Sequence, residues 1–280
     1  MKRKCFIFGS NGMLGNYVKL FLSMYYDVIN LTRKDYDLSK LSYKSLTDLL
    51  INKNISSNDV IINCAGVIPQ SSKQRLINTR LFYTVNSLFP VILSEISTSL
   101  SCKMIHITTD CVFSGTKGNY NEESQHDETN NYGISKSLGE LCNATIIRTS
   151  IIGEEINNKR SLLEWVISNK NGEINGYKNH FWNGVTCYQL AKIVYEIIDK
   201  SLYWSGVKHI YTPNAVSKYQ LVSYINETYD LNIKINPFNT EQIIDKTLTT
   251  IYKPLFEIPD LKQQIKEQKN INIHLGDNIE

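Results

Sequence analysis

Short apolar runs alternate with amphipathic stretches through the first half of the chain. The runs are rich in Val, Ile and Phe, as is typical of strands buried on both faces of a parallel sheet, and the stretches between them have a helical period. Strands are predicted at residues 4–8, 27–31, 60–66, 103–107 and 144–147. Helices are predicted up to about residue 24, at 43–52, and at 76–100 with a break or kink at Pro90. This alternation predicts an α/β fold with a doubly wound (Rossmann) parallel sheet.

The pattern becomes looser in the second half of the chain. Helices are predicted at residues 161–169, 188–200, 218–230 and 240–244, and short strands at residues 173–176 and 208–211. The last stretch, from about residue 263, is polar and is expected to fray. We therefore predict a Rossmann domain over residues 1–150. Residues 151–280 are expected to form a smaller α/β substrate-binding lobe, interleaved with the first domain.

The bulk composition argues against several classes of function. The 280 residues carry a net charge of +3, too mild for a nucleic-acid or membrane-surface partner. The apolar run at the N-terminus ends at Gly9, too short for a signal-peptide core, and no stretch approaches the roughly 20 apolar residues of a spanning helix. Six cysteines are scattered without a CxxC pair, so we expect no metal site, no disulfide framework and a cytoplasmic location.

The first predicted strand runs directly into a glycine-rich turn, GSNGMLG, over residues 9–15. Gly9 permits a tight turn, Gly12 lets the backbone approach a pyrophosphate, and Gly15 lets the following helix pack closely on the strand. The phosphates would meet the N–H groups at the start of that helix. The spacing is GxxGxxG rather than GxGxxG, but its place at the first strand-to-helix turn favours a dinucleotide site.

The end of the second predicted strand bears on the choice between NAD and NADP. In NAD-preferring folds an acidic residue tends to stand there and bind the ribose hydroxyls. Here the strand ends in Thr32, Arg33 and Lys34. A guanidinium can hold a 2′-phosphate with two hydrogen bonds, whereas a carboxylate would repel it. We therefore predict NADPH as the cofactor, held in part by Arg33.

Candidate acid–base chemistry lies further along the chain. Tyr132 and Lys136 are spaced i and i+4 where the pattern turns helical, so both side chains leave one face of the helix. A phenol has an ordinary pKa of about 10, and a neighbouring ammonium lowers it toward the range useful for proton exchange. The hydroxyl of Thr109, near the end of the fourth strand, could orient the group that is protonated.

These features fall at one edge of the predicted sheet. Gly9, residues 63–66, Thr109 and Ser150 each follow the carboxyl end of a predicted strand. Open α/β sheets bind their ligands at that edge. The small side chains of residues 64–66 would also let a cofactor lie against the backbone. The sequence therefore predicts one cofactor-dependent crevice.

The motifs GSNGMLG, NCAG, HITTDCVFSG, YGISKSLGE and RTS occur here in a familiar order and spacing. They resemble those of the extended short-chain dehydrogenase/reductases, and among these dTDP-4-dehydrorhamnose reductase and its sugar-nucleotide-binding relatives. The resemblance covers nearly all the chain and is most specific through residue 150. It implies NADPH-dependent reduction of the C4 ketone of a nucleotide-activated 4-keto-6-deoxy sugar, in the biosynthesis of a deoxysugar for a glycan or polysaccharide. It also implies a homodimer.

The resemblance assigns roles to individual residues. Tyr132 would protonate the C4 oxygen, Lys136 would hold the nicotinamide ribose and lower the pKa of Tyr132, and Thr109 would bind the same oxygen, with Thr108 as its substitute if the register differs. The cofactor set is Gly9, Asn11, Gly12, Met13, Leu14, Gly15, Arg33, Asp37, Leu38, Cys64, Ala65, Gly66, Asn86, Tyr132 and Lys136. The substrate set is Thr109, Asp110, Cys111 and Ile151.

Two departures from the family pattern leave the sugar open. Ile151 stands where these reductases commonly carry an aromatic residue, and residues 184–186, Gly-Val-Thr, lack the proline of a G-x-P-T segment. Both positions belong to the substrate side of the resemblance. The substrate is therefore either dTDP-4-dehydrorhamnose-like or a UDP-linked 2-acetamido-2,6-dideoxy-4-ketohexose.

Other functions within the same resemblance also stay open. Related dehydratases carry an acid pair after the threonine, whereas here Cys111 follows Asp110, which argues against dehydration. Epimerase/reductases that resemble GDP-fucose synthase place a cysteine at this position and use a distant histidine, for which His180 is the candidate. A further alternative is an NADP-binding regulatory subunit without catalysis, like that of methionine adenosyltransferase. The intact Thr109, Tyr132 and Lys136 favour an enzyme.

Overall fold

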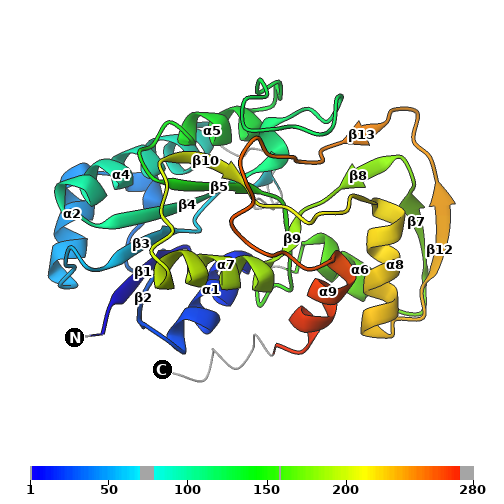
Figure 1. Ribbon diagram of the computed structural model, residues 1–280, viewed down its shortest axis with the longest axis horizontal. Helices are drawn as coiled ribbons and strands as arrows, with labels where there is room; N and C mark the ends of the chain where they lie inside the picture. The colour runs from blue at the N-terminus through cyan, green and yellow to red at the C-terminus, as the bar shows by residue number, and fades with distance from the viewer. Residues whose placement is uncertain (1, 70–78, 158, 272–280) are drawn as a thin grey trace.

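The computed structural model describes residues 2–69, 79–157 and 159–271. Six strands form a wholly parallel sheet in the order β10-β5-β4-β3-β1-β2 (Figure 1). The strands are β1 (Lys4–Phe8), β2 (Asp27–Leu31), β3 (Val60–Asn63), β4 (Lys103–Thr109), β5 (Thr145–Thr149) and β10 (Gly206–His209). The order reverses between β1 and β3, and such a reversal opens a crevice at the carboxyl ends of the strands. The predicted doubly wound α/β fold is confirmed.

Helices cover both faces of this sheet. The helices are α1 (Met13–Ser23) and α7 (Cys187–Asp199) on one face, and α2 (Tyr43–Asn52) and α4 (Phe89–Ser99) on the other. Strand β1 shows why: Cys5 and Ile7 pack toward α1 and α7, whereas Phe6 and Phe8 pack toward α2 and α4. Side chains alternate along a strand, so a continuous apolar run supplies both faces. Figure 1 shows α1 and α7 side by side.

Two predicted elements end differently in the structure. Strand β3 ends at Asn63 rather than at residue 66, because the Asn63 side chain accepts the N–H of Ala65 and turns the chain out of the sheet. The predicted helix at 76–100 consists of α3 (Thr79–Phe82), a π-helical stretch (Tyr83–Leu88) and α4, and residues 76–78 lie outside the described ranges. The irregular stretch comes just before Pro90, which lies in the first turn of α4.

The second half builds a lobe beside the sheet, on the right in Figure 1. Its helices are α6 (Leu162–Ser168), α8 (Lys218–Tyr229) and α9 (Leu261–Lys269). Its strands pair as β6 (Ile151–Ile152) with β9 (Val185–Thr186), and β7 (Glu173–Tyr177) with β12 (Lys234–Phe238). In a third sheet β8 (His180–Trp182) lies between β11 (Val216–Ser217) and β13 (Ile244–Asp245) and pairs with both. Residues beyond 150 also contribute α7 and β10 to the main sheet and its covering layer. The division of the chain into two interleaved domains stays a prediction.

Two expectations for the second half were wrong. The segment predicted as a helix at 240–244 is a loop that leads into β13, because Thr240 bonds to Asn179 and Ile244 pairs with β8. The polar stretch from residue 263 does not fray where it is described, since α9 runs to Lys269. Its Gln264 and Gln268 side chains are fully buried and accept the N–H groups of Thr186 and Tyr188. Buried glutamines at i and i+4 do not register as an apolar stripe in the sequence.

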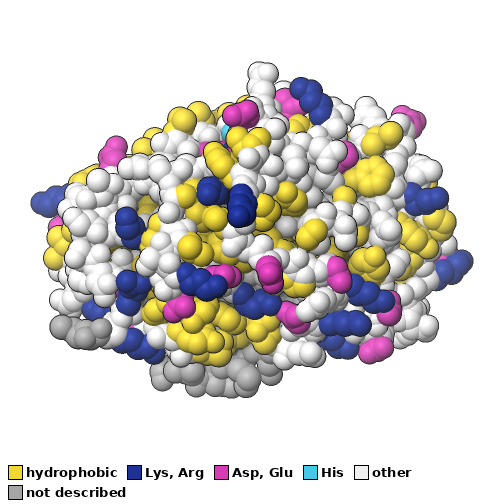
Figure 2. All heavy atoms as spheres, viewed as in Figure 1, with side chains coloured by type: hydrophobic (Ala, Val, Ile, Leu, Met, Phe, Trp, Pro, Cys, Tyr) yellow, Lys and Arg dark blue, Asp and Glu magenta, His cyan; other side chains and the backbone are white. Residues whose placement is uncertain are grey.

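The surface is mixed in charge. Figure 2 shows Lys and Arg side chains interspersed with Asp and Glu side chains on one face of the molecule. Such a mixture produces no strong field of one sign on that face. In the described part of the chain no helix is long and apolar enough to cross a membrane. The described residues also contain no group of three or more His, Cys, Asp or Glu side chains that could hold a metal ion.

Candidate active site

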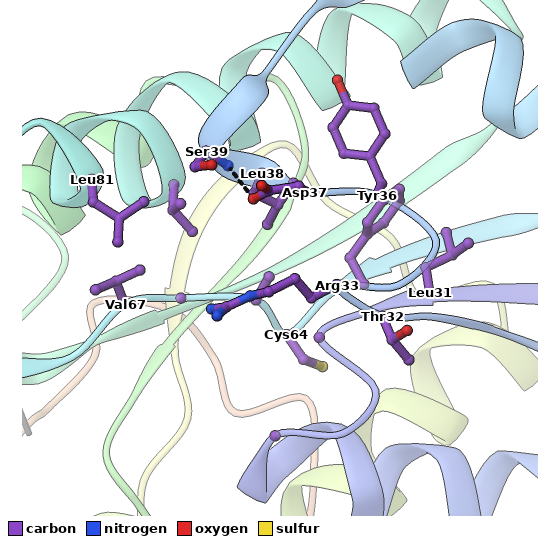
Figure 3. A pocket seen from close by; sticks show the side chains of 16 residues that line it. Leu31, Thr32, Arg33, Tyr36, Asp37, Leu38, Ser39, Cys64, Val67 and Leu81 are labelled. Atoms are coloured by element: carbon purple, nitrogen blue, oxygen red, sulfur yellow. Dashed lines mark hydrogen bonds between the residues drawn. The ribbon is translucent and has the colours of Figure 1, made fainter. Parts of the chain in front are cut away.

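Two adjoining pockets lie at the carboxyl ends of the sheet strands. The first, of about 430 Å³, lies beside the ends of β1, β2 and β3 (Figure 3). The second, of about 400 Å³, lies between the ends of β4 and β5 and the helix α5 (Asn131–Gly139). Gly12, Cys64 and Gly66 line both pockets, so the two form parts of one crevice.

The predicted site residues are distributed between these pockets. The first is lined by Gly9, Gly12, Arg33, Asp37, Leu38, Cys64, Ala65 and Gly66 of the cofactor set. The second is lined by Asn11, Gly12, Met13, Leu14, Cys64, Gly66, Tyr132 and Lys136 of that set and by all of the substrate set, Thr109, Asp110, Cys111 and Ile151. Gly15 and Asn86 are not among the described lining residues. They contact the backbone segments that form the pocket walls.

The glycine-rich turn is shaped by close backbone contacts. Gly9 has a positive φ of 76°, and a Cβ there would lie 2.7 Å from the backbone nitrogen of Ala65. A Cβ on Gly15 would collide with the carbonyl group of Gly9, so only glycine lets α1 start this close to the strand. A Cβ on Gly12 meets only the Gly9 oxygen, at 3.2 Å. Gly12 therefore leaves open space in the crevice rather than serving a packing contact.

Arg33 extends across the first pocket, where Figure 3 shows Asp37, Leu38 and Ser39 on the wall above it. Asp35, the first carboxylate after β2, is turned away: it accepts the N–H and the hydroxyl of Thr32, both at 2.9 Å, and pairs with Lys53. Asp37 accepts the N–H of Ser39 at 3.0 Å. A guanidinium thus reaches into the pocket at the place where NAD-binding folds present a carboxylate.

Tyr132, Lys136 and Thr109 meet in the second pocket. The side chain of Asn130 caps α5 by accepting the N–H of Gly133 at 2.9 Å, and Tyr132 and Lys136 follow one turn apart. The Thr109 hydroxyl interacts with the Tyr132 phenol, and Thr108 lines the same pocket. Lys136 is buried, and a Cβ on Gly66 would lie 2.8 Å from its Nζ.

Burial controls the protonation of these groups. It lowers the pKa of Lys136 to about 8, and the carboxylate of Glu140 opposes that shift. Burial also raises the pKa of Tyr132, with Cys111 adding to the rise and the Thr109 hydroxyl opposing it. The expected lowering of the Tyr132 pKa by Lys136 is therefore wrong for this structure, because desolvation dominates. The phenol carries its proton at neutral pH and can donate it.

Asn86 clamps the wall of the crevice to α5. Its side-chain oxygen accepts the N–H of Val67 at 2.9 Å, and its amide nitrogen donates to the Val67 carbonyl and to the hydroxyl of Ser135. Ser87 adds a bond of 2.7 Å to the Ser135 carbonyl. Both come from the π-helical stretch before α4. The contacts join the segment after β3 to the helix that carries Tyr132.

Cys111 is held as a thiol. Its pKa is raised to about 12, first by burial and then by the carboxylate of Asp110. His180, the histidine suggested for an epimerase, lies outside the described lining of the pocket, and its Nε2 lies 2.8 Å from the hydroxyl of Thr240. His180 is therefore not among the residues that line the pocket with Cys111.

Sequence reasoning missed two cations of the lobe. Lys218 and Lys246 act on the buried carboxyl group of Asp110, whose pKa burial raises and these charges lower. Lys218 lies over the ring of Trp182 at 5.1 Å, and Lys246 pairs with Glu128 at 3.5 Å. Neither belongs to a motif in the sequence. Only the packing of the lobe against the sheet brings them toward the site.

This fold and this constellation define a short-chain dehydrogenase/reductase of the extended type. Residues 3–249 match the family model described as RmlD substrate binding domain, and the chain belongs to that family. The spore coat polysaccharide biosynthesis protein SpsK of Bacillus subtilis is 25% identical in an alignment 262 residues long, which covers 90% of this chain and 88% of that protein.

Solved structures show the same fold. The dTDP-4-dehydrorhamnose reductase of Bacillus anthracis, in complex with NADP, has a TM-score of 0.79 at 21% identity, over 96% of this chain and 99% of the other. The dTDP-4-dehydrorhamnose reductase of Yersinia enterocolitica has a TM-score of 0.78 at 21% identity, over 95% and 98%. The agreement extends across both the sheet and the lobe.

Proposed function

We propose that this protein reduces the C4 ketone of a nucleotide-activated 4-keto-6-deoxy sugar with NADPH. The observation that carries the proposal is the meeting of Thr109, Tyr132 and Lys136 in a pocket that adjoins the glycine-turn pocket. A proton donor thus stands beside a site shaped for a dinucleotide. The names of the relatives in the family, reductases of a dTDP-linked keto-sugar and a polysaccharide biosynthesis protein, support the same class of reaction.

The two pockets together have the features expected of an NADP site. The turn from Gly9 to Gly12 keeps side chains away from the start of α1, where a pyrophosphate would bind the exposed N–H groups. Arg33 would bind the 2′-phosphate, and Asp37 and Leu38 would flank the adenine. Lys136 would hold the nicotinamide ribose. When bound, the cofactor supplies a hydride to the ketone carbon.

The residues of the second pocket carry out the proton transfer. Tyr132 donates its phenolic proton to the C4 oxygen, and Thr109, which reaches the same phenol, binds that oxygen. Lys136 offsets the negative charge left on the Tyr132 oxygen, which requires its ammonium form. Lys218 and Lys246 add positive charge beside Asp110, which suits an anionic nucleotide sugar.

The test is a panel of dTDP-, UDP- and GDP-linked 4-keto-6-deoxy sugars, with NADPH consumption as the readout. We expect turnover with a dTDP-4-dehydrorhamnose-like sugar or with a UDP-linked 2-acetamido-2,6-dideoxy-4-ketohexose. Tyr132→Phe should abolish it while NADPH still binds. Tyr83→Phe is the control, because Tyr83 bonds to Asn131 at the start of α5 but lies outside the described pocket lining. Unchanged turnover in Tyr132→Phe would refute the assignment of the proton donor.

A further inference from the structure

A buried ion pair joins the helix that carries Tyr132 and Lys136 to the neighbouring strand. Arg148 on β5 donates from Nε to Glu140, the C-cap residue that follows α5, at 3.0 Å, and its Nη2 donates to the other carboxylate oxygen. The two side chains are only 2% and 5% exposed. Arg148 also lies over the ring of Phe113 at 5.2 Å. A buried carboxylate needs such a partner to remain ionised.

Two histidines complete the surroundings of Arg148. The imidazole of His209 donates from Nδ1 to the carbonyl of Thr249 at 2.7 Å, so its Nε2 is free to accept from Arg148 at 2.8 Å. Nε2 of His126 likewise accepts a hydrogen bond from Nη2 of Arg148, at 2.7 Å. Burial lowers the pKa of His126, and it lowers the pKa of His209 to about 4. The charge of Arg148 adds to the lowering for both rings. Both rings are thus neutral at pH 7 and leave the carboxylate as the anion that faces Arg148.

Glu140 lies one helical turn beyond Lys136. Tyr132, Lys136 and Glu140 follow one another at intervals of four residues, so they lie along one stripe of the α5 surface. Lys136 is buried, and Glu140 is the largest influence that opposes the effect of burial on the pKa of its ammonium. The family motif accounts for Tyr132 and Lys136, but the proposed reaction gives no task to Glu140 or Arg148.

We propose that Glu140 is a positioning residue: its carboxylate, fixed by Arg148, keeps the Lys136 ammonium charged and directed into the crevice one turn away on the same helix. The effect on turnover rests on the proposed function. The charge on Lys136 is a property of the protein alone and can be measured without any substrate.

The other groups that face this pair do not titrate near neutral pH. Around Lys136 these are Cys64 and Cys111, with pKa values raised to about 12 by burial, and His106, with its pKa lowered to about 3 by burial. Beside Glu140 the thiol of Cys142 has its pKa raised to about 12, also by burial. A titration near pH 8 at this place therefore belongs to Lys136.

The experiment follows Lys136 directly, by NMR of protein labelled with carbon-13 at the lysine Cε. The Lys136 signal is assigned by its loss in Lys136→Met, and its titration is compared between wild type and Glu140→Gln. We expect the midpoint to fall by about one pH unit, as when a neighbouring opposite charge is removed. Glu122→Gln is the matched control: it removes a charge from the same network, where Glu122 binds His209 and Ile251, but not beside Lys136. In Glu122→Gln the midpoint of the Lys136 titration should equal that of wild type.

Two further variants keep the proposal testable if Glu140→Gln fails to fold with Arg148 left unpaired. Glu140→Gln combined with Arg148→Met removes both partners of the ion pair and should lower the midpoint as well. Glu140→Asp keeps the charge and should hold the midpoint near that of wild type. An unmoved midpoint in the double variant, or an equal shift in Glu122→Gln, would overturn the role of Glu140.

Turnover provides the second readout. In Glu140→Gln the fall of kcat at alkaline pH should begin at lower pH, whereas mere structural damage would lower kcat equally at every pH. If wild type reduces none of the sugar nucleotides, the proposed function fails, yet the lysine titration still decides the role of Glu140.

Discussion

The two pockets of the crevice share lining residues but are formed by different kinds of groups. The pocket beside β1, β2 and β3 is shaped by backbone and missing side chains, as at Gly9 and Gly15. The pocket beside β4, β5 and α5 is built from buried ionisable groups, above all Lys136 and Asp110. The first therefore depends on volume and the second on charge. Substitutions that change only one of these properties should separate binding from chemistry.

The largest expected effect is in the charged pocket. Lys136→Met keeps most of the side-chain volume but removes the cation that offsets the charge on Tyr132, so we expect kcat to fall by about a hundredfold or more. Stability should hold or rise, because burying the ammonium costs free energy in the folded protein, as its lowered pKa shows. Steady-state kinetics and urea unfolding measure the two effects. A stable variant with normal kcat would contradict the role of Lys136.

The next effect belongs to the glycine pocket. Gly15→Ala forces a Cβ into the Gly9 carbonyl group and should destabilise the fold by about 1–3 kcal/mol. Gly12→Ala meets only the Gly9 oxygen, at 3.2 Å, and should leave stability nearly unchanged while weakening NADPH binding. Thermal unfolding and cofactor titration distinguish the pair. Equal loss of stability in both variants would mean that Gly12 serves packing rather than a ligand.

A smaller effect concerns the choice of cofactor. Arg33→Ala should reduce the preference for NADPH over NADH by roughly tenfold to a hundredfold, since a hydrogen bond to a charged group contributes about 1.5–3 kcal/mol. Lys34→Ala is the control, because Lys34 is exposed and lies outside the described pocket lining. Binding constants for both cofactors provide the measurement. If wild type binds the two equally, the charge argument at the end of β2 is wrong.

The smallest effect is a pH dependence. The pKa of Lys136 is lowered to about 8 by burial, so its ammonium form is lost as pH rises through that value. The reductase activity should fall to about half near pH 8 if only this group limits it. The sign for stability is opposite: a lysine whose pKa is lower in the folded state destabilises the fold below that pKa, and the penalty disappears as pH rises. A pH profile of kcat that stays flat through this range would remove Lys136 from the proton chemistry.

The fold and most of the lining residues were predictable, because local rules govern them. The apolar runs of β1 and β3 and the turn from Gly9 to Gly15 each follow from residues close together in sequence. The carboxyl ends of parallel strands then bring Thr109 and Ile151 to the same crevice. The helix predicted at 240–244 and the frayed end from residue 263 were wrong. Long-range hydrogen bonds from Thr240 to Asn179 and from Thr186 to Gln264 overrode local preference there.

The sequence by itself determined the parallel sheet, the position of the glycine turn and the pairing of Tyr132 with Lys136. The alternation of strands with helices and the helical spacing are periodic and local properties of the chain. Only the tertiary structure decided which charged side chains surround the site residues. Lys218 and Lys246 approach Asp110 from a distant lobe, and Arg148 holds Glu140 from a neighbouring strand. The tertiary structure also decided the protonation of Tyr132 and Cys111, because a pKa depends on burial and on neighbours in space rather than on neighbours in the chain.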